Sequence, residues 1–326
     1  MPSGPPAKKK RERRILDCVY ARLSPVEVIP SERPDFLVRL RDGLPLFGVE
    51  VTEFYDKAAR ARLQRSPGYV GELLSHHRYR HKEDKAELAL ATANIRTPSG
   101  GLKAAGVQCV LTENPSLDSC AQKAARAIRS KDAKLDSTLG GVTHVNLVIC
   151  DRTGLLGLVD SSMFYARFCT TELKEAIFGS MYREIYFVTR LSGKHSYVPL
   201  KLLTTAAELR VFIEVLLRQQ TGAPPVVPVD LTRQFAAYLN TRVAGLVRLR
   251  THDGGSEVLY GDGAFAVNDA YGIDVRMYED DALPRGETIP KKELSRNDVA
   301  LHGMMRTFME QNVLSIDLSF PAGPLP

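Results

Sequence analysis

The first helical pattern of the chain lies between residues 10 and 23. Ile15, Val19 and Leu23 recur at every fourth position there, which predicts a helix with one apolar face. The preceding residues 1–9 are rich in proline and lysine, and we expect them to form a flexible basic tail. The folded part of the chain is therefore expected to begin near residue 10.

Two short apolar runs then predict an antiparallel hairpin. Residues 36–40 and 45–54 are separated by the segment 41–43, an Arg-Asp-Gly sequence that is typical of a tight turn. Successive side chains of a strand point to opposite faces. The second strand therefore carries Phe47, Val49 and Val51 on one face, and Gly48, Glu50 and Thr52 on the other.

Downstream, the pattern predicts alternating helices and strands. Residues 55–95 are typical of polar helices, and 96–107 are rich in glycine and serine and precede a short strand at 107–111. We further expect helices over 116–135, 161–178, 205–219 and 230–245 and from Ser295 onward, and strands over 142–150, 185–189, between 246 and 279, and near 313–320.

A glycine- and proline-rich segment, 222–228, is the best candidate for a linker. It predicts a division into a larger α/β domain over 10–221 and a smaller α+β C-terminal domain over 229–326, to which the sequence assigns no role. We find no internal repeat.

The composition is that of an ordinary globular protein, with 44% hydrophobic and 25% charged residues. No apolar run is long enough to span a membrane, no secretory signal is visible, and the five cysteines form no CxxC pair. These features favour a cytoplasmic protein without a membrane partner. Most of the net charge of +6 lies in the N-terminal segment, so charge alone does not identify a nucleic-acid-binding protein.

Two carboxylates in the hairpin are the main candidates for chemistry. Asp35 precedes the first strand, and Glu50 lies within the apolar second strand, where burial is costly unless the carboxylate is paired or bound to metal. In a hairpin of this length the two side chains could lie close together, and Mg²⁺ or Mn²⁺ would relieve their repulsion. The alternative is that Glu50 faces solvent on an edge strand and Asp35 is an ordinary turn residue.

The spacing of these residues resembles the PD-(D/E)xK nuclease superfamily: Pro34 and Asp35, then Glu50 fifteen residues later, then Thr52. The resemblance covers roughly residues 10–151. It implies a three-layer, restriction-endonuclease-like α/β core, a mixed sheet flanked by helices, to which the α+β C-terminal region is added. It also implies that Asp35 and Glu50 bind the metal that activates a water for hydrolysis of phosphodiester bonds.

The chain departs from this family at Thr52, where a lysine is usual. Some members carry the lysine on the crossover helix instead, and Lys131 and Lys134 of the helix 116–135 are the candidates here. Lys131 lies three residues after Ile128, at the edge of the apolar stripe, so its amine could reach Glu50. If neither lysine reaches the site, the domain is expected to be either catalytically weak or an inactive module that binds nucleic acid or protein.

Additional acidic and basic residues extend this hypothesis. Glu12 of the first helix is a candidate third metal ligand, and Glu32 is a similar outer candidate. Basic residues after the Glu50 strand are expected to contact phosphates, although a solvated helix face is the alternative. The candidates are Arg60, Arg62, Arg65, Arg78, Arg80 and Lys82.

The sequence leaves several points open. His76, His77 and His81 suggest zinc at first sight, but no HExxH frame or cysteine accompanies them. The expected partner is nucleic acid, with DNA preferred and RNA left open. Defence against foreign DNA is a common setting for proteins with this pattern, by analogy only. Assembly into a homo-oligomer is also left open.

Overall fold

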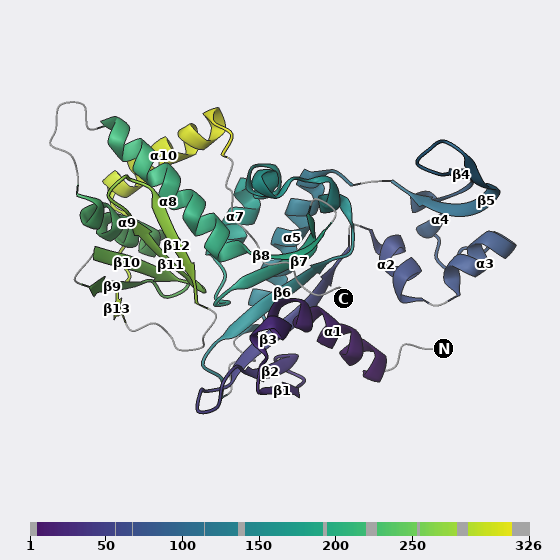
Figure 1. The fold of residues 1–326 in the computed structure, drawn as a ribbon, viewed down its shortest axis with the longest axis horizontal. Coiled ribbons are helices and arrows are strands. Elements are labelled where there is room, and N and C mark those ends of the chain that lie inside the picture. Colours follow the sequence, from purple (N-terminus) through teal and green to yellow (C-terminus); the bar gives the residue numbers. More distant parts are fainter. Residues whose placement is uncertain are drawn as a thin grey trace.

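The computed structural model describes residues 5–55, 57–66, 68–113, 115–135, 141–191, 194–219, 227–252, 255–278 and 286–314 (Figure 1). Its centre is a six-stranded mixed sheet in the order β1-β2-β3-β6-β7-β8. The strands are β1 (Glu27–Pro30), β2 (Phe36–Arg39), β3 (Phe47–Phe54), β6 (Val145–Asp151), β7 (Ile185–Leu191) and β8 (Lys194–Pro199). β3, β6 and β7 run parallel, whereas the pairs β1–β2, β2–β3 and β7–β8 are antiparallel.

Helices cover both faces of this sheet. α1 (Pro5–Tyr20) packs on the face formed by Phe47, Val49 and Val51 of β3, together with residues of β2, β6 and β7. α5 (Leu117–Asp132) packs on the opposite face, where Phe54 of β3 joins another hydrophobic cluster. The alternation along β3 follows the sequence pattern, and the expected α/β class with a mixed sheet flanked by helices is confirmed.

A small lobe is inserted between β3 and α5 (Figure 1). It contains α2 (Ala58–Arg65), α3 (Tyr69–His76), α4 (Asp84–Glu87) and the two-stranded ribbon of β4 (Leu88–Arg96) and β5 (Leu102–Thr112). Ala59, Tyr69, Leu73 and Leu88 form its small core.

The C-terminal part contains a second sheet in the order β12-β11-β10-β9-β13. Its strands are β9 (Arg248–His252), β10 (Gly255–Tyr260), β11 (Gly263–Val267), β12 (Ile273–Met277) and β13 (Glu287–Thr288). The helices outside α1–α5 are α6 (Phe164–Phe168), α7 (Thr171–Phe178), α8 (Leu200–Gln219), α9 (Pro228–Arg242) and α10 (Arg296–Gln311), with short 3₁₀ turns at Ala21–Leu23, Leu155–Leu158 and Ser161–Met163.

Helix α8 is shared by the two parts of the chain. Its residues Leu200 and Leu203 belong to the hydrophobic cluster of the first sheet, whereas Leu202 and Leu209 belong to that of the second sheet. The predicted linker overlaps the segment 220–226, which lies outside the described residues, as does most of the strand expected near 313–320. The division into two domains stays a prediction.

Several expected elements differ from the structure. Residues 5–9 belong to α1 rather than to a tail, because nothing after Pro5 and Pro6 interrupts helical hydrogen bonding. Residues 88–96 are a strand rather than a helix, and β5 occupies half of the expected loop and extends the short strand. Much of this ribbon is exposed on both faces, so it lacks the alternation that marks a strand in sequence.

Candidate functional site

Asp35 lies at one end of the central sheet, where the pairing of β2 with β3 begins. Phe36 pairs with Val49 in this antiparallel ladder. Asp35 therefore lies beside Glu50 across the two strands. The backbone N–H of Val51 donates to Asp35 Oδ2 at 2.9 Å, and only 7% of Asp35 is exposed. The carboxylate of Asp35 is thus fixed by the backbone of β3.

Close packing against β3 helps to hold this segment in place. A Cβ atom on Gly48 would lie 2.6 Å from Cγ of Pro34 and 3.0 Å from Cγ2 of Val145. Both separations are shorter than an unstrained contact between carbon atoms. Position 48 therefore admits no side chain without displacing Pro34, the residue that precedes Asp35.

Glu50 lies on the side of β3 that faces α5. Lys131, in the last turn of α5, donates from Nζ to Glu50 Oε1 at 2.5 Å. The side chains of Glu50 and Lys131 are 16% and 27% exposed. The helical spacing predicts that the amine of Lys131 could reach Glu50, and the structure has this contact. A catalytic role for Lys131 stays a prediction.

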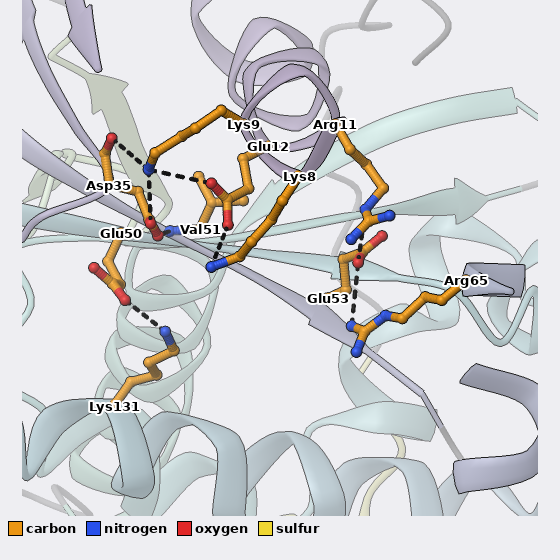
Figure 2. A network of polar contacts seen from close by, with 10 residues as sticks. All are labelled: Lys8, Lys9, Arg11, Glu12, Asp35, Glu50, Val51, Glu53, Arg65 and Lys131. Carbon is orange, nitrogen blue, oxygen red and sulfur yellow. Dashed lines mark hydrogen bonds and ion pairs between the residues drawn. The ribbon is translucent and has the colours of Figure 1, made fainter. Parts of the chain in front are cut away.

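A second cationic contact reaches Asp35 from α1. Lys9 Nζ lies 3.1 Å from Asp35 Oδ1 and 3.2 Å from Glu12 Oε2 (Figure 2). Lys8 Nζ lies 3.3 Å from Glu12 Oε1. Glu12 is 6% exposed, and its Oε2 forms no hydrogen bond with any described residue, although Lys9 approaches it. An ammonium thus occupies the space between two buried carboxylates.

The surroundings set the protonation of two groups in this region. Burial lowers the pKa of the Lys9 ammonium, but Asp35 and Glu12 outweigh burial and raise this pKa above its ordinary value. Burial, assisted by the charge of Glu50, raises the pKa of Tyr182 above its ordinary value. Lys9 therefore stays charged and Tyr182 stays neutral at pH 7.

Asp35, Glu50, Glu12, Lys8, Lys131 and Tyr182 line one cleft with a volume of about 790 Å³. Thr52 lies two residues beyond Glu50 in the same strand and also lines the cleft, half-buried. Lys134 lies just beyond the end of α5, where it is exposed at the cleft wall. Glu32 is another exposed residue of the wall. The cleft therefore gathers every residue that the sequence assigned to catalysis or to the metal.

The arrangement and contacts of the carboxylates can be compared with what a metal ion requires of its ligands. Among the described residues, no group of three or more histidine, cysteine, aspartate or glutamate side chains is arranged to hold a metal. Asp35, Glu50 and Glu12 each contact a lysine ammonium instead. Carboxylate oxygens are the ligands that Mg²⁺ and Mn²⁺ prefer. The three carboxylates are thus of the ligand type that a hard divalent cation prefers, and in the structure lysine ammonium groups contact them.

Two of the arginines expected to bind nucleic acid form ion pairs within the lobe. Arg62 pairs with Asp84, which is fully buried, and Arg80 pairs with Glu72 on the surface of the lobe. These pairs hold the elements of the lobe together. Arg78 and Lys82 of the same set are exposed in the segment that follows α3.

The remaining two arginines of the set lie at the base of the lobe. Arg60 donates to the backbone carbonyl of Thr153 and to the hydroxyl of Thr112. Arg65 lies 3.1 Å from Glu53 and lines the cleft. Of these six basic residues, Arg65 is therefore the one at the cleft wall. The three histidines of the lobe are exposed: His76, His77 and His81.

Sequence reasoning missed several groups at the site, among them Lys8 and Tyr182 of the cleft wall and Lys9, which contacts Asp35 and Glu12. The pattern places Lys8 and Lys9 in a tail, although the run from Ala7 to Arg14 contains no helix breaker and could have indicated that the helix begins earlier. Tyr182 lies in a short loop before β7, and its hydroxyl donates to the carbonyl of Lys131 at 3.4 Å. No local pattern in the sequence distinguishes Tyr182 from a core tyrosine.

Comparison with known proteins gives no relative. No protein-family model, no curated protein and no solved structure matches the chain. Among the described helices, none is both long and apolar enough to cross a membrane.

Proposed function

We propose that this protein is a metal-dependent nuclease that hydrolyses phosphodiester bonds of nucleic acid, with DNA as the preferred substrate. The observation that carries the proposal is the meeting of Asp35, Glu50 and Lys131 in one cleft. Two carboxylates from neighbouring strands and an amine from the crossover helix are the groups that metal-assisted hydrolysis of a phosphodiester needs.

The order of elements supports the same proposal. The succession of α1, three antiparallel strands, α5 and the parallel strand β6 resembles the order expected of a PD-(D/E)xK, restriction-endonuclease-like core. The inserted lobe lies between the third strand and α5. Thr52 stands where the family usually has a lysine, and Lys131 supplies an ammonium next to Glu50 from the other side of the cleft.

Asp35 and Glu50 would hold Mg²⁺ or Mn²⁺, and Glu12 is the candidate third carboxylate. When bound, the metal lowers the pKa of a water and neutralises charge on the phosphate. The N–H of Val51 keeps the Asp35 carboxylate oriented. Lys131 holds Glu50 in place and supplies positive charge where the phosphate becomes more negative.

The charges around the cleft favour a polyanionic substrate. The wall carries Lys8, Arg11, Arg65 and Lys134 in addition to Lys131. These side chains come from α1, from the lobe and from the region after α5, so they surround the carboxylates from several directions. Such an arrangement suits the phosphates of a nucleic-acid backbone.

A cleavage assay tests this function. The purified protein is incubated with plasmid DNA, a DNA oligonucleotide duplex, a single strand and RNA, with Mg²⁺, with Mn²⁺ or with EDTA. We expect cleavage of at least one substrate with metal and none with EDTA. Glu50→Gln keeps the size of the side chain but removes its charge, and we expect a rate at least about 100-fold lower.

Glu27→Gln is the matched control for this assay. Glu27 lies on β1 of the same sheet, its side chain is 42% exposed and it pairs with Arg39. We expect the rate of this variant to equal that of the wild type. Metal-dependent cleavage that survives in Glu50→Gln would assign the activity to another site or to a contaminant, and absence of cleavage on all substrates would favour the inactive module.

A further inference from the structure

A second hollow opens beside the cleft, with a volume of about 220 Å³. Four arginines and one carboxylate line it, together with a tyrosine: Arg11, Arg14, Arg65, Arg152, Glu53 and Tyr55. The arginines come from α1, from α2 and from the residue that follows β6, so segments far apart in sequence converge on this hollow.

Glu53 is shared by three guanidinium groups. Arg11 Nε, Arg65 Nη2 and Arg152 Nε each lie 3.1 Å from an oxygen of Glu53. Figure 2 shows Arg11 and Arg65 reaching Glu53 from two sides. One carboxylate balances one positive charge, so most of the guanidinium charge in the hollow has no counter-charge in its lining.

The hollow combines a guanidinium positioned by an aromatic ring, a buried nitrogen without a hydrogen bond and a tyrosine hydroxyl. The guanidinium of Arg65 lies over the ring of Tyr55, 4.6 Å from its centre. Arg11 Nε is buried and forms no hydrogen bond with any described residue, although it lies near Glu53. Burial, assisted by Glu53, raises the pKa of Tyr55, so its hydroxyl keeps a proton to donate.

We infer that this hollow is a phosphate-binding subsite. A phosphate group offers several acceptor oxygens and negative charge, and arginine binds phosphate through paired, charge-assisted hydrogen bonds. The buried Nε of Arg11, the excess of guanidinium groups and the protonated Tyr55 are matched to such a group.

The position of the subsite indicates which phosphate it takes. Glu53 lies three residues beyond Glu50 in β3, about 10 Å along the strand. The hollow and the cleft also share Arg11, Glu53 and Arg65 in their walls. Resting on the proposed nuclease function, the subsite takes a nucleic-acid phosphate near the bond to be cut, either within the chain or at its 5′ end.

Phosphate binding in the absence of metal tests the subsite separately from catalysis. Inorganic phosphate is titrated into the full-length protein in EDTA, with chloride at matched ionic strength as the reference, and binding is followed by calorimetry. We expect saturable binding of phosphate. No binding beyond the chloride reference overturns the subsite, whatever the cleavage assay gives.

Three variants test which arginines belong to the phosphate-binding subsite. Arg14→Gln and Arg65→Gln are each expected to weaken phosphate binding about tenfold. The control is Arg13→Gln, since Arg13 is exposed on the same helix and pairs with Asp17 outside the hollow. Phosphate affinity in Arg13→Gln should equal that of the wild type. Equal loss in all three variants, or no loss in any, overturns the assignment.

A substitution that removes a negative charge from the hollow should strengthen phosphate binding, whereas damage to the structure would weaken it. Glu53→Gln keeps the shape of the side chain and removes the charge that competes with phosphate. We expect this variant to bind phosphate several-fold more tightly than the wild type. Weaker binding in a variant that keeps the wild-type circular dichroism spectrum would overturn the subsite.

Oligonucleotides distinguish the source of the phosphate. The same DNA strand with and without a 5′ phosphate competes with inorganic phosphate in EDTA. Stronger competition by the 5′-phosphorylated strand assigns the subsite to a chain end, and equal competition assigns it to an internal phosphate. If neither strand competes, the link to nucleic acid is wrong. If strands bind but no metal-dependent cleavage occurs, the subsite stands and the nuclease function fails.

Discussion

Lys131 Nζ lies 2.5 Å from Glu50 Oε1, although 81 positions separate the two residues in the chain. α5 packs across the face of the sheet that Glu50 occupies, so its last turn comes level with the middle of β3. A lysine in this turn can therefore place its ammonium beside Glu50, as a lysine at position 52 of the strand could. This relation between a helix and a strand gives the proposed site its missing cation.

Replacement of Lys131 should separate catalysis from folding. We expect Lys131→Gln to lower the rate of metal-dependent cleavage by about 10²- to 10⁴-fold. The free energy of unfolding should fall by about 1 kcal/mol or less, because the ion pair with Glu50 is partly exposed. Single-turnover cleavage and urea unfolding measure the two effects.

Lys134→Gln distinguishes between the two lysines of this region. Lys134 is exposed at the wall of the same cleft, three residues further along the chain. We expect a loss of rate within about threefold for this variant, as for removal of a general phosphate contact. A larger loss in Lys134→Gln than in Lys131→Gln would contradict the role given to Lys131.

The Lys9 ammonium should compete with a metal ion. It lies between Asp35 and Glu12, so Lys9→Gln removes a positive charge from the position that a cation would take. We expect Mn²⁺ to bind this variant about twofold to tenfold more tightly, measured by electron paramagnetic resonance of free Mn²⁺. Lys10→Gln, at the exposed neighbouring position, should leave the affinity unchanged. Weaker Mn²⁺ binding in Lys9→Gln would mean that Lys9 supports the metal site instead.

Gly48 should be essential for the position of Asp35. A Cβ atom at position 48 would lie 2.6 Å from Pro34, so Gly48→Ala must displace Pro34 or the strand. We expect a loss of about 1–3 kcal/mol in the free energy of unfolding and a lower cleavage rate. Gly71→Ala is the control, because Gly71 lies in α3 with open space around it, and alanine favours a helix. Equal stability of the two variants would contradict the close packing.

Stability should decrease between pH 5 and pH 7 because of Glu184. Burial, assisted by the charge of Asp262, raises the pKa of Glu184 from 4.5 to about 7. The folded protein therefore holds this proton more tightly than the unfolded chain does. The contribution of Glu184 to stability is full below pH 4.5 and is lost as the pH rises through about 7.

Glu184→Gln should flatten this pH dependence, since Gln keeps an oxygen that can accept from the N–H groups of Ile185 and Lys201. Burial lowers the pKa of Lys201 to about 8, so Lys201 titrates above this range. Urea unfolding at intervals from pH 5 to pH 7.5 gives the two slopes. Equal slopes for the variant and the wild type would show that other groups cause the pH dependence.

The parts of the site that follow a strong local pattern were predictable from sequence. The alternation along β3 assigned Glu50 to the side opposite Val49, and the apolar stripe of α5 fixed the direction of Lys131. Both depend on periodicities of 2.0 and 3.6 residues, which the backbone imposes. The carboxylate–lysine pair could therefore be inferred before the fold was known.

Other parts depend on contacts that no local pattern records. Lys9 reaches Asp35 because α1 begins at Pro5 and lies over the edge of the hairpin. The three arginines around Glu53 come from α1, from α2 and from the residue that follows β6. Of the β4–β5 ribbon the pattern predicts only the short strand at 107–111, because much of the ribbon is exposed on both faces and lacks a periodic apolar face. Tertiary packing determines each of these features.

Anomalous diffraction from crystals soaked in Mn²⁺ tests the central claim most directly, since that claim is a hard divalent cation held by Asp35 and Glu50. We predict a Mn²⁺ peak within about 2.0–2.6 Å of a carboxylate oxygen from each of these two residues, with Lys9 displaced from Asp35. A peak bound to other residues, or no peak in the cleft at a saturating concentration of Mn²⁺, would contradict it.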